Sequence, residues 1–491
     1  MYHLGALSFF FFWIVAVSGL YLYVVFDTSV YGAYASVEWI THDQWYLAGV
    51  MRSLHRYASD AMVVSVIVHL SREFFIDHHR GFRWFSWFTG VPLLWLLFSS
   101  GINGYWLVWD DLAQFLAVNT AEWLDWLPVF DGQMARNFIS EARLSDRFFS
   151  LLVFLHIGIP LALLLGMWIH IQRITRARVN PPAGLMFGTL AALLALSLVK
   201  PALSQGGQAN LDVAVAEVGL DWFYLAMYPL IDLTSSGAVW WLLIGLTLML
   251  GALPWLPPAR RDPVAVVDLG NCNGCARCFA DCPYSAITMQ PRSDGLPYAQ
   301  EAVVDAGLCA SCGLCAGACP TATPFRRATE LVPGIDLPHL PVRGIREQVL
   351  AGASAMSGEG RILVFGCAHG APLTTVSGQS TAAVTLPCVG ALPPSFIDFV
   401  LSRHHADGVV LAGCGSCDCN FRLGIDWTEQ RLARERDPQL RSRVPRERLA
   451  TCWAGRYGGK SLQRCIDGLR RNLSASSAPS ATGTSTEQRS A

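Results

Sequence analysis

The chain has 491 residues, 52% of them hydrophobic, and a formal net charge of −1, which argues against a polyanionic partner such as a nucleic acid. All 15 cysteines follow residue 258, whereas most of the Trp and Phe residues precede it. A secreted disulfide framework is excluded, because eight cysteines form two Cys-x2-Cys-x2-Cys-x3-Cys-Pro runs with metal-ligand spacing. The composition predicts a membrane half followed by a soluble, cysteine-rich half.

The first half contains apolar runs long enough to cross a hydrocarbon core of ~30 Å, which takes about 20 residues. Six spans are expected, at about 5–26, 54–75, 87–108, 148–171, 184–200 and 237–256. The first carries no basic leader or small-residue cleavage site, so we expect a retained helix. The expected fold class is multi-domain and begins with an all-α transmembrane bundle of six helices over 1–257.

The arginines predict how this bundle is oriented. They follow the second, fourth and sixth spans, whereas loop 27–51 has neither Lys nor Arg and loop 110–147 is mostly acidic. The basic residues after the three spans are Arg72, Arg80, Arg83, Arg173, Arg176, Arg178, Arg260 and Arg261. Because cytoplasmic loops are the basic ones, both termini and the cysteine-rich half are expected in the cytoplasm, at a bacterial inner membrane.

Four histidines lie inside the expected spans, where ionisable side chains are costly and therefore functional candidates. His55 and His69 are 14 residues apart on the second span, and His156 and His170 are 14 apart on the fourth. Fourteen residues is close to four helical turns, or about 21 Å, so each pair shares one face. With both helices running inward, His55 pairs with His156 and His69 with His170, which predicts two haems. The bland alternative is four unrelated core histidines.

Glycines repeat with the same period. Gly5 and Gly19 are 14 residues apart on the first span, and Gly90 and Gly104 are 14 apart on the third. A flat macrocycle needs missing side chains where its edge meets backbone, so we expect these glycines to line the haems. Close helix packing is the alternative reading.

Residues 1–175 resemble the haem-bearing half of cytochrome b from quinol–cytochrome c or plastocyanin oxidoreductases. The stretches RSLHRYASDAM, GYWLVWDD and ARLSDRFFSLLVFLH carry the resemblance. It implies that Arg52 meets a haem propionate, that the chain binds quinone or quinol, and that it forms a homodimer. The family's later helices are absent.

The segment LDWFYLAMYPL from Leu220 is similar to the family's PEWY-type segment, where a carboxylate accepts a proton at the outer quinol-oxidation site. Asp221 falls on that position, although Leu replaces Pro and Asp replaces Glu. The alternative is a solvated loop acid before an interfacial aromatic belt.

After a Pro- and Arg-rich linker, residues 264–325 resemble bacterial two-cluster ferredoxins, with an α+β fold. In such double runs the fourth cysteine ligates the other cluster. One 4Fe–4S cluster is then expected on Cys272, Cys275, Cys278 and Cys319, and the other on Cys309, Cys312, Cys315 and Cys282. Zinc is the competing metal, but zinc sites favour two distant Cys-x2-Cys pairs.

Residues 360–472 are expected to form a small α/β domain with a parallel sheet. RILVFG, VTLPC and GVVLAG are strand candidates, with helices expected over 392–405 and around 424–436. Cysteines follow the expected strand ends, where open sheets bind ligands.

This part resembles the iron–sulfur delta subunit of methyl-viologen-reducing hydrogenase. The resemblance implies a 2Fe–2S cluster on Cys367, Cys388, Cys414 and Cys419, and a soluble flavoprotein partner of the heterodisulfide-reductase type. The sequence departs from the family at His369, where a second cysteine is usual, and in the extra Cys417. Buried structural cysteines or a redox disulfide are the alternatives. Cys452 and Cys465 are expected to be structural, and 473–491 a disordered tail.

Together the parts predict a membrane electron-transfer subunit of a quinone-dependent oxidoreductase, with the direction of electron flow open. One alternative is a redox wire and membrane anchor in the lipid bilayer without its own quinone site. Another is a sulfur- or disulfide-linked oxidoreductase using Cys417 or Cys452.

Overall fold

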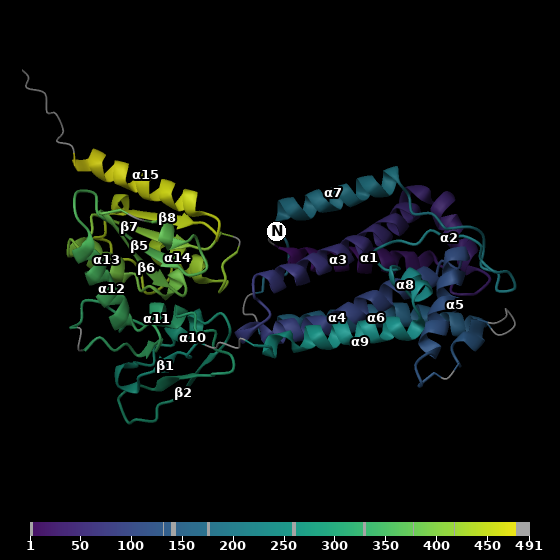
Figure 1. Ribbon diagram of the computed structural model, residues 1–491, viewed down its shortest axis with the longest axis horizontal. Helices are drawn as coiled ribbons and strands as arrows, with labels where there is room; N and C mark the ends of the chain where they lie inside the picture. Colours follow the sequence, from purple (N-terminus) through teal and green to yellow (C-terminus); the bar gives the residue numbers. More distant parts are fainter. Residues whose placement is uncertain are drawn as a thin grey trace, which may run out of the picture. The chain divides into compact units, whose positions relative to one another are not determined.

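The computed structural model describes residues 3–130, 132–138, 144–173, 177–257, 262–327, 330–376, 378–416 and 418–477. The chain divides into two compact units, Met1–Ala259 and Arg260–Ala491. The ferredoxin-like segment and the α/β segment therefore share one unit, although they were expected as separate domains. Figure 1 shows the helices of the first unit and the sheet of the second.

The first unit is built mainly of helices, which are joined by loops such as 200–226. Its helices are α1 Leu4–Val25, α2 Ala33–His42, α3 Val50–Phe75, α4 Trp84–Trp106, α5 Asp111–Asp125, α6 Asp146–Ile171, α7 Ala183–Val199, α8 Met227–Leu233 and α9 Ser236–Ala252. A helix therefore covers each of the six expected spans. In Figure 1, α1 lies along α3, and α4 lies along α6 and α9.

Four helical segments in the described part of the chain are long and apolar enough to cross a membrane: Leu4–Val25, Gly81–Trp106, Phe149–Ile171 and Ser236–Trp255. Helix α7 is apolar but shorter. Helix α3 has 26 residues but carries several charged side chains, including Arg56, Asp60 and Glu73. The expectation of several apolar spanning helices is confirmed, and α3 is the polar member of the bundle.

The second unit starts with short strands and two one-turn helices. Strands β1 Val266–Val267 and β4 Ile335–Asp336 pair antiparallel, as do β2 Ile287–Pro291 and β3 Gln300–Val304. Helices α10 Arg277–Asp281 and α11 Leu314–Ala318 each follow the second cysteine of a Cys-x2-Cys-x2-Cys run. The third cysteine of each run, Cys278 or Cys315, therefore lies on a short helix that directly follows the loop with the first two cysteines.

A four-stranded parallel sheet with the order β6-β5-β7-β8 follows. Its strands are β5 Ile362–Cys367, β6 Thr381–Leu386, β7 Gly408–Gly413 and β8 Leu449–Trp453. Its helices are α12 Val342–Ala355, α13 Ser395–Ser402, α14 Gly424–Ala433 and α15 Gly459–Ser477. The parallel-sheet domain is confirmed, and β8, α12 and α15 are elements that the sequence patterns missed.

Both faces of this sheet are covered, as in other parallel sheets. Alternate residues of β5 and β7 pack against α12, α13 and α14 on one face and against α15 on the other. Helix α15 continues to Ser477, so the expected disordered tail does not begin at 473. The rest of that expected tail, 478–491, lies outside the described residues.

Candidate functional site

Two histidine pairs lie between the helices of the first unit. His55 of α3 and His156 of α6 have their ring centres 6.2 Å apart. His69 and His170 lie close enough to interact electrostatically. Imidazole–metal bonds of about 2 Å, with roughly 1 Å from each nitrogen to its ring centre, put two ring centres around one metal ion about 6 Å apart. The His55–His156 spacing fits such an ion.

The other nitrogen of each of these two rings lies within hydrogen-bond distance of a backbone carbonyl. Nδ1 of His55 is 3.0 Å from the Val15 oxygen, and Nδ1 of His156 is 3.1 Å from the Ser100 oxygen. With Nδ1–H donating to a carbonyl, Nε2 keeps its lone pair for a metal. Both rings thus have the surroundings typical of metal-ligating histidines.

The second pair has polar neighbours of a different kind. Nδ1 of His170 is 3.2 Å from the Thr89 hydroxyl, and Nδ1 of His69 is 3.9 Å from a Glu73 carboxylate oxygen. Glu73 also accepts a hydrogen bond from His78 at 2.7 Å. The His69 contact is longer than a hydrogen bond, so the two levels of the bundle differ in how firmly they hold their rings.

Each of the four periodic glycines faces one of the four histidines. A Cβ atom added at the glycine would approach Cε1 of the opposing ring to 2.9 Å for Gly19 and His55, 2.8 Å for Gly104 and His156, 3.2 Å for Gly90 and His170, and 3.5 Å for Gly5 and His69. The glycines were expected to line a macrocycle edge. Each one lies directly against an imidazole, where a side chain would crowd the ring, and contact of these glycines with a macrocycle stays a prediction.

Arg52, expected to meet a haem propionate, is half-buried near the N-terminal end of α3. It donates to the Thr41 hydroxyl and, at 3.1 Å, to the Ser204 hydroxyl. Among the described residues it forms no ion pair within 4 Å. The carboxylates of Glu38 and Asp110 lie near enough to interact with its charge, and Glu38 accepts a hydrogen bond from the Ser204 hydroxyl at 2.6 Å.

Asp221 lies in a network that the sequence patterns did not anticipate. One carboxylate oxygen accepts from Arg56 at 2.8 Å and from the Tyr105 hydroxyl. The other oxygen accepts from two backbone N–H groups, at 2.8 and 2.9 Å. Arg56 also pairs with Asp60 at 2.9 Å. The i,i+4 charge pair inside an expected span is the signal by which Arg56 and Asp60 could have been found.

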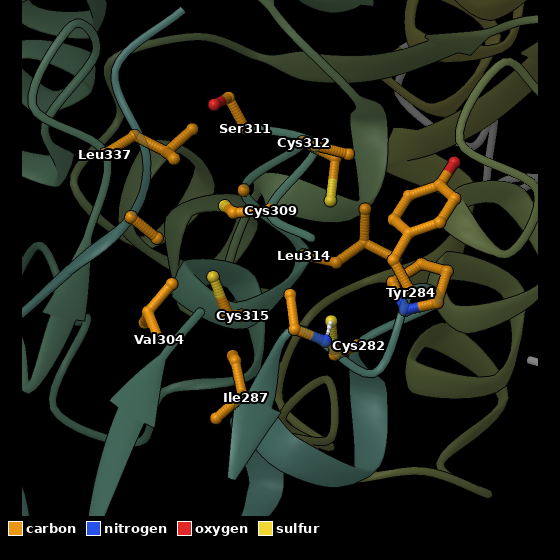
Figure 2. A pocket seen from close by; sticks show the side chains of 15 residues that line it. Cys282, Tyr284, Ile287, Val304, Cys309, Ser311, Cys312, Leu314, Cys315 and Leu337 are labelled. Atoms are coloured by element: carbon orange, nitrogen blue, oxygen red, sulfur yellow. Dashed lines mark hydrogen bonds between the residues drawn. The ribbon is translucent and has the colours of Figure 1, made fainter. Parts of the chain in front are cut away.

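Two pockets in the second unit are each lined by four cysteines. Figure 2 shows the sulfur atoms of Cys282, Cys309, Cys312 and Cys315 pointing into one of them. The other is lined by Cys272, Cys275, Cys278 and Cys319. The structure therefore brings together the two sets expected from the cysteine runs, with the fourth cysteine of each run in the other run's pocket.

Burial determines the protonation of these thiols. It raises the pKa of Cys278 and of Cys312 to about 12, and that of Cys315 well above its usual range. Thiolates are the ligands of iron, so metal binding has to release these protons. Four thiols around one pocket fit an iron–sulfur cluster, although Cys275 is exposed to solvent.

A third set of four cysteines, Cys367, Cys388, Cys414 and Cys419, lies near the carboxyl ends of β5 and β7. Sγ atoms of Cys367 and Cys414 are 3.5 Å apart. Hydrogen bonds from Cys388 and Cys414 lower the pKa of Cys419 below its usual range, so the four thiols converge. A Cβ at Gly424 would lie 2.2 Å from the Cys388 sulfur, which explains why glycine occupies this position.

The remaining candidates lie elsewhere. The His369 ring packs edge-on against Phe421, with ring centres 5.4 Å apart. The thiols of Cys452 and Cys465 hydrogen-bond to each other, on the sheet face covered by α15. Cys417 lies outside the described residues.

Family comparisons match three consecutive regions. Residues 1–177 match cytochrome b/b6/petB, residues 271–323 match a 4Fe–4S dicluster domain, and residues 362–475 match the delta subunit of methyl-viologen-reducing hydrogenase.

Individual relatives match the membrane region. Cytochrome b6 of Gracilaria tenuistipitata var. liui is 29% identical over 185 residues, which cover 37% of this chain and 84% of the relative. Cytochrome b6 of Heliobacterium mobile is 32% identical over 133 residues, 27% of this chain and 62% of the relative. A chain of a hyperthermophilic respiratory complex III aligns with a TM-score of 0.43 and 18% identity, over 51% of this chain and 74% of the other. The protein thus combines a cytochrome b/b6 domain, a 4Fe–4S dicluster domain and a hydrogenase delta-subunit-like domain, a combination that fits a membrane electron-transfer subunit.

Proposed function

We propose that this chain links the quinone pool, through two haems b, to two 4Fe–4S clusters, one 2Fe–2S cluster and a soluble flavoprotein of the heterodisulfide-reductase type. The observation that carries the proposal is the grouping of possible ligands: two histidine pairs in one unit, and three groups of four thiols in the other. Bound haem and clusters supply one-electron chemistry. The chain's own residues provide ligation, burial and spacing.

The proposed haem ligands are His55 with His156 and His69 with His170. Carbonyl acceptors orient the first pair of rings, and the four glycines leave room for all four rings. The proposed cluster ligands are the three thiol groups described above. Both termini and the second unit would lie in the cytoplasm, following the distribution of arginines.

The proposed outer quinol site centres on Asp221. Its carboxylate is held by Arg56, Tyr105 and two backbone N–H groups, so it must exchange one of these partners to receive a quinol proton. Electrons could then move inward from quinol, or outward from low-potential cytoplasmic donors to quinone. The same saturation of Asp221 favours the second candidate function, a redox wire without its own quinone site.

Replacing Asp221 with asparagine separates these two functions. Asparagine can still accept from the backbone N–H groups, but it cannot accept a proton or pair with the Arg56 charge. Reduction of the bound haems by an added quinol should slow about 100-fold or more, the usual contribution of a general base. Stopped-flow absorbance would measure the rate, and Asp232→Asn in α8 is the matched control. Intact quinol oxidation in Asp221→Asn would remove Asp221 from the site, and no reduction by quinol in the wild type would favour the wire.

Cysteine substitutions test the exchange of the fourth ligand between the two runs. We expect Cys319→Ala and Cys275→Ala to alter the same 4Fe–4S resonance signal, because both thiols line one pocket. Cys282→Ala and Cys309→Ala should alter the other signal. Electron paramagnetic resonance of the reduced variants would decide. If Cys319→Ala instead matched Cys309→Ala, each run would ligate its own cluster.

A further inference from the structure

A single buried arginine contacts the backbone or side chains of three cysteine-bearing segments in the second unit. Arg431 of α14 has a side chain only 2% exposed. It donates to the Gly390 carbonyl at 2.8 Å, to the Asp281 carboxylate at 2.5 Å and to the Leu314 carbonyl at 3.5 Å. Asp281 immediately precedes Cys282, Leu314 precedes Cys315, and Gly390 follows Cys388 by two residues. The guanidinium group therefore bridges two different sets of four cysteines: the set that contains Cys282 and Cys315, and the set that contains Cys388.

The charges around this arginine do not cancel. Asp281, with a side chain 4% exposed, also pairs with Arg436, whose guanidinium stacks 3.4 Å above the Trp427 ring. The Trp427 indole N–H donates to the Asp281 carbonyl at 3.2 Å. Two arginines thus share one aspartate, which leaves a net positive charge in a poorly solvated place.

The segment around α11 and the segment that follows Cys388 also contact each other directly. A Cβ at Gly317 of α11 would lie 2.1 Å from the Gly390 carbonyl oxygen, so the backbones pack without intervening side chains. Cys312 and Cys388 are close enough to interact electrostatically. Arg431 likewise interacts with Cys388. The thiol group of Cys367, Cys388, Cys414 and Cys419 is therefore the neighbour of the pocket in Figure 2.

We propose that Arg431 is a positioning residue that locks these two sites together and raises their reduction potentials relative to the pocket of Cys272, Cys275, Cys278 and Cys319. This inference rests on the proposed occupancy of the sites by iron–sulfur clusters. A fixed positive charge in a low-dielectric interior stabilises an added electron, and hydrogen bonding and net charge set cluster potentials. The Nε–H of Arg431 has no hydrogen-bond partner among the described residues, so this donor is available to an additional acceptor.

The test is an anaerobic redox titration of the full-length holoprotein, followed by electron paramagnetic resonance, for Arg431→Met and Arg431→Lys. In Arg431→Met, the reduced-to-oxidised ratio of the 2Fe–2S site and of the adjacent 4Fe–4S site should fall at least tenfold at a given potential, which is 59 mV for one electron. The third cluster should keep its potential. Arg443→Met is the matched control, because Arg443 also pairs with a buried aspartate, Asp398, but within the described part of the chain it bonds to no cysteine-bearing segment.

Arg431→Lys separates charge from position. Lysine keeps the charge but loses the forked contacts, so the potentials should stay near the wild type while the magnetic interaction between the two reduced sites weakens. An Arg431→Met protein with unshifted potentials, or with all three shifted equally, would overturn the proposal. If Arg431→Met does not assemble, an unchanged interaction in Arg431→Lys would overturn it. Absence of the three cluster signals from the wild type would instead refute the proposed function.

Discussion

Replacing His55 with alanine should halve the haem content of the protein, from two haems per chain to one. His55 and His156 face each other across one level of the bundle, whereas His69 and His170 lie at the other level. Without the His55 imidazole, a haem at that level would be held by His156 alone, whereas the other level would keep both of its proposed ligands. Haem per chain, measured as the pyridine haemochrome of purified protein, would report the loss.

The companion substitution should remove the other haem. His69→Ala is expected to leave one haem with a potential different from the one that survives in His55→Ala. His42→Ala is the control, because the His42 side chain is 62% exposed and pairs with Glu38 and not with any of the four proposed haem ligands. Two haems in His55→Ala, or identical remaining potentials in the two variants, would contradict the assignment of ligands to separate levels.

Alanine substitutions of the four glycines should have graded effects on haem binding. The added methyl group would lie 2.8 Å from the opposing ring at Gly104 and 2.9 Å at Gly19, closer than real Cβ contacts allow. At Gly90 the distance is 3.2 Å, and at Gly5 it is 3.5 Å, an ordinary contact. Gly104→Ala and Gly19→Ala should therefore lose the His55–His156 haem, Gly90→Ala should bind its haem more weakly, and Gly5→Ala should keep both haems.

Gly158 provides a matched control for this series. It lies on α6, two residues from His156, and an added Cβ there would meet nothing within 4 Å. Gly158→Ala should retain two haems with unchanged absorption bands. Equal haem content in Gly158→Ala and Gly104→Ala would show that the glycines are not required for the rings, and would return them to the role of helix packing.

The histidine and cysteine patterns were predictable because their spacing is itself geometry. A 14-residue repeat on a helix places two side chains on one face, and a Cys-x2-Cys-x2-Cys loop gathers three thiols. The direction of both histidine helices followed from the arginines, and it led to the pairing of His55 with His156. The glycine period is equally visible in the sequence, but the imidazole that opposes each glycine is not, because it comes from another helix.

Contacts between residues far apart in the sequence were not predictable. Arg56 and Asp221 are 165 residues apart, and Arg431 and Asp281 are 150 apart. No local period marks such pairs, because tertiary packing alone brings them together. The short strand β8 and the polar-faced helices α12 and α15 were also missed, since their apolar positions emerge only against the sheet that they cover.

The most direct test of the account is an anaerobic redox titration of the purified wild-type protein, with optical spectra for haem and electron paramagnetic resonance for iron–sulfur clusters. We expect two haems b that titrate separately, two 4Fe–4S signals and one 2Fe–2S signal per chain. A single haem, or none, in protein with all its clusters intact would contradict the proposal that two haems, each held by one histidine pair, carry electrons across the bilayer.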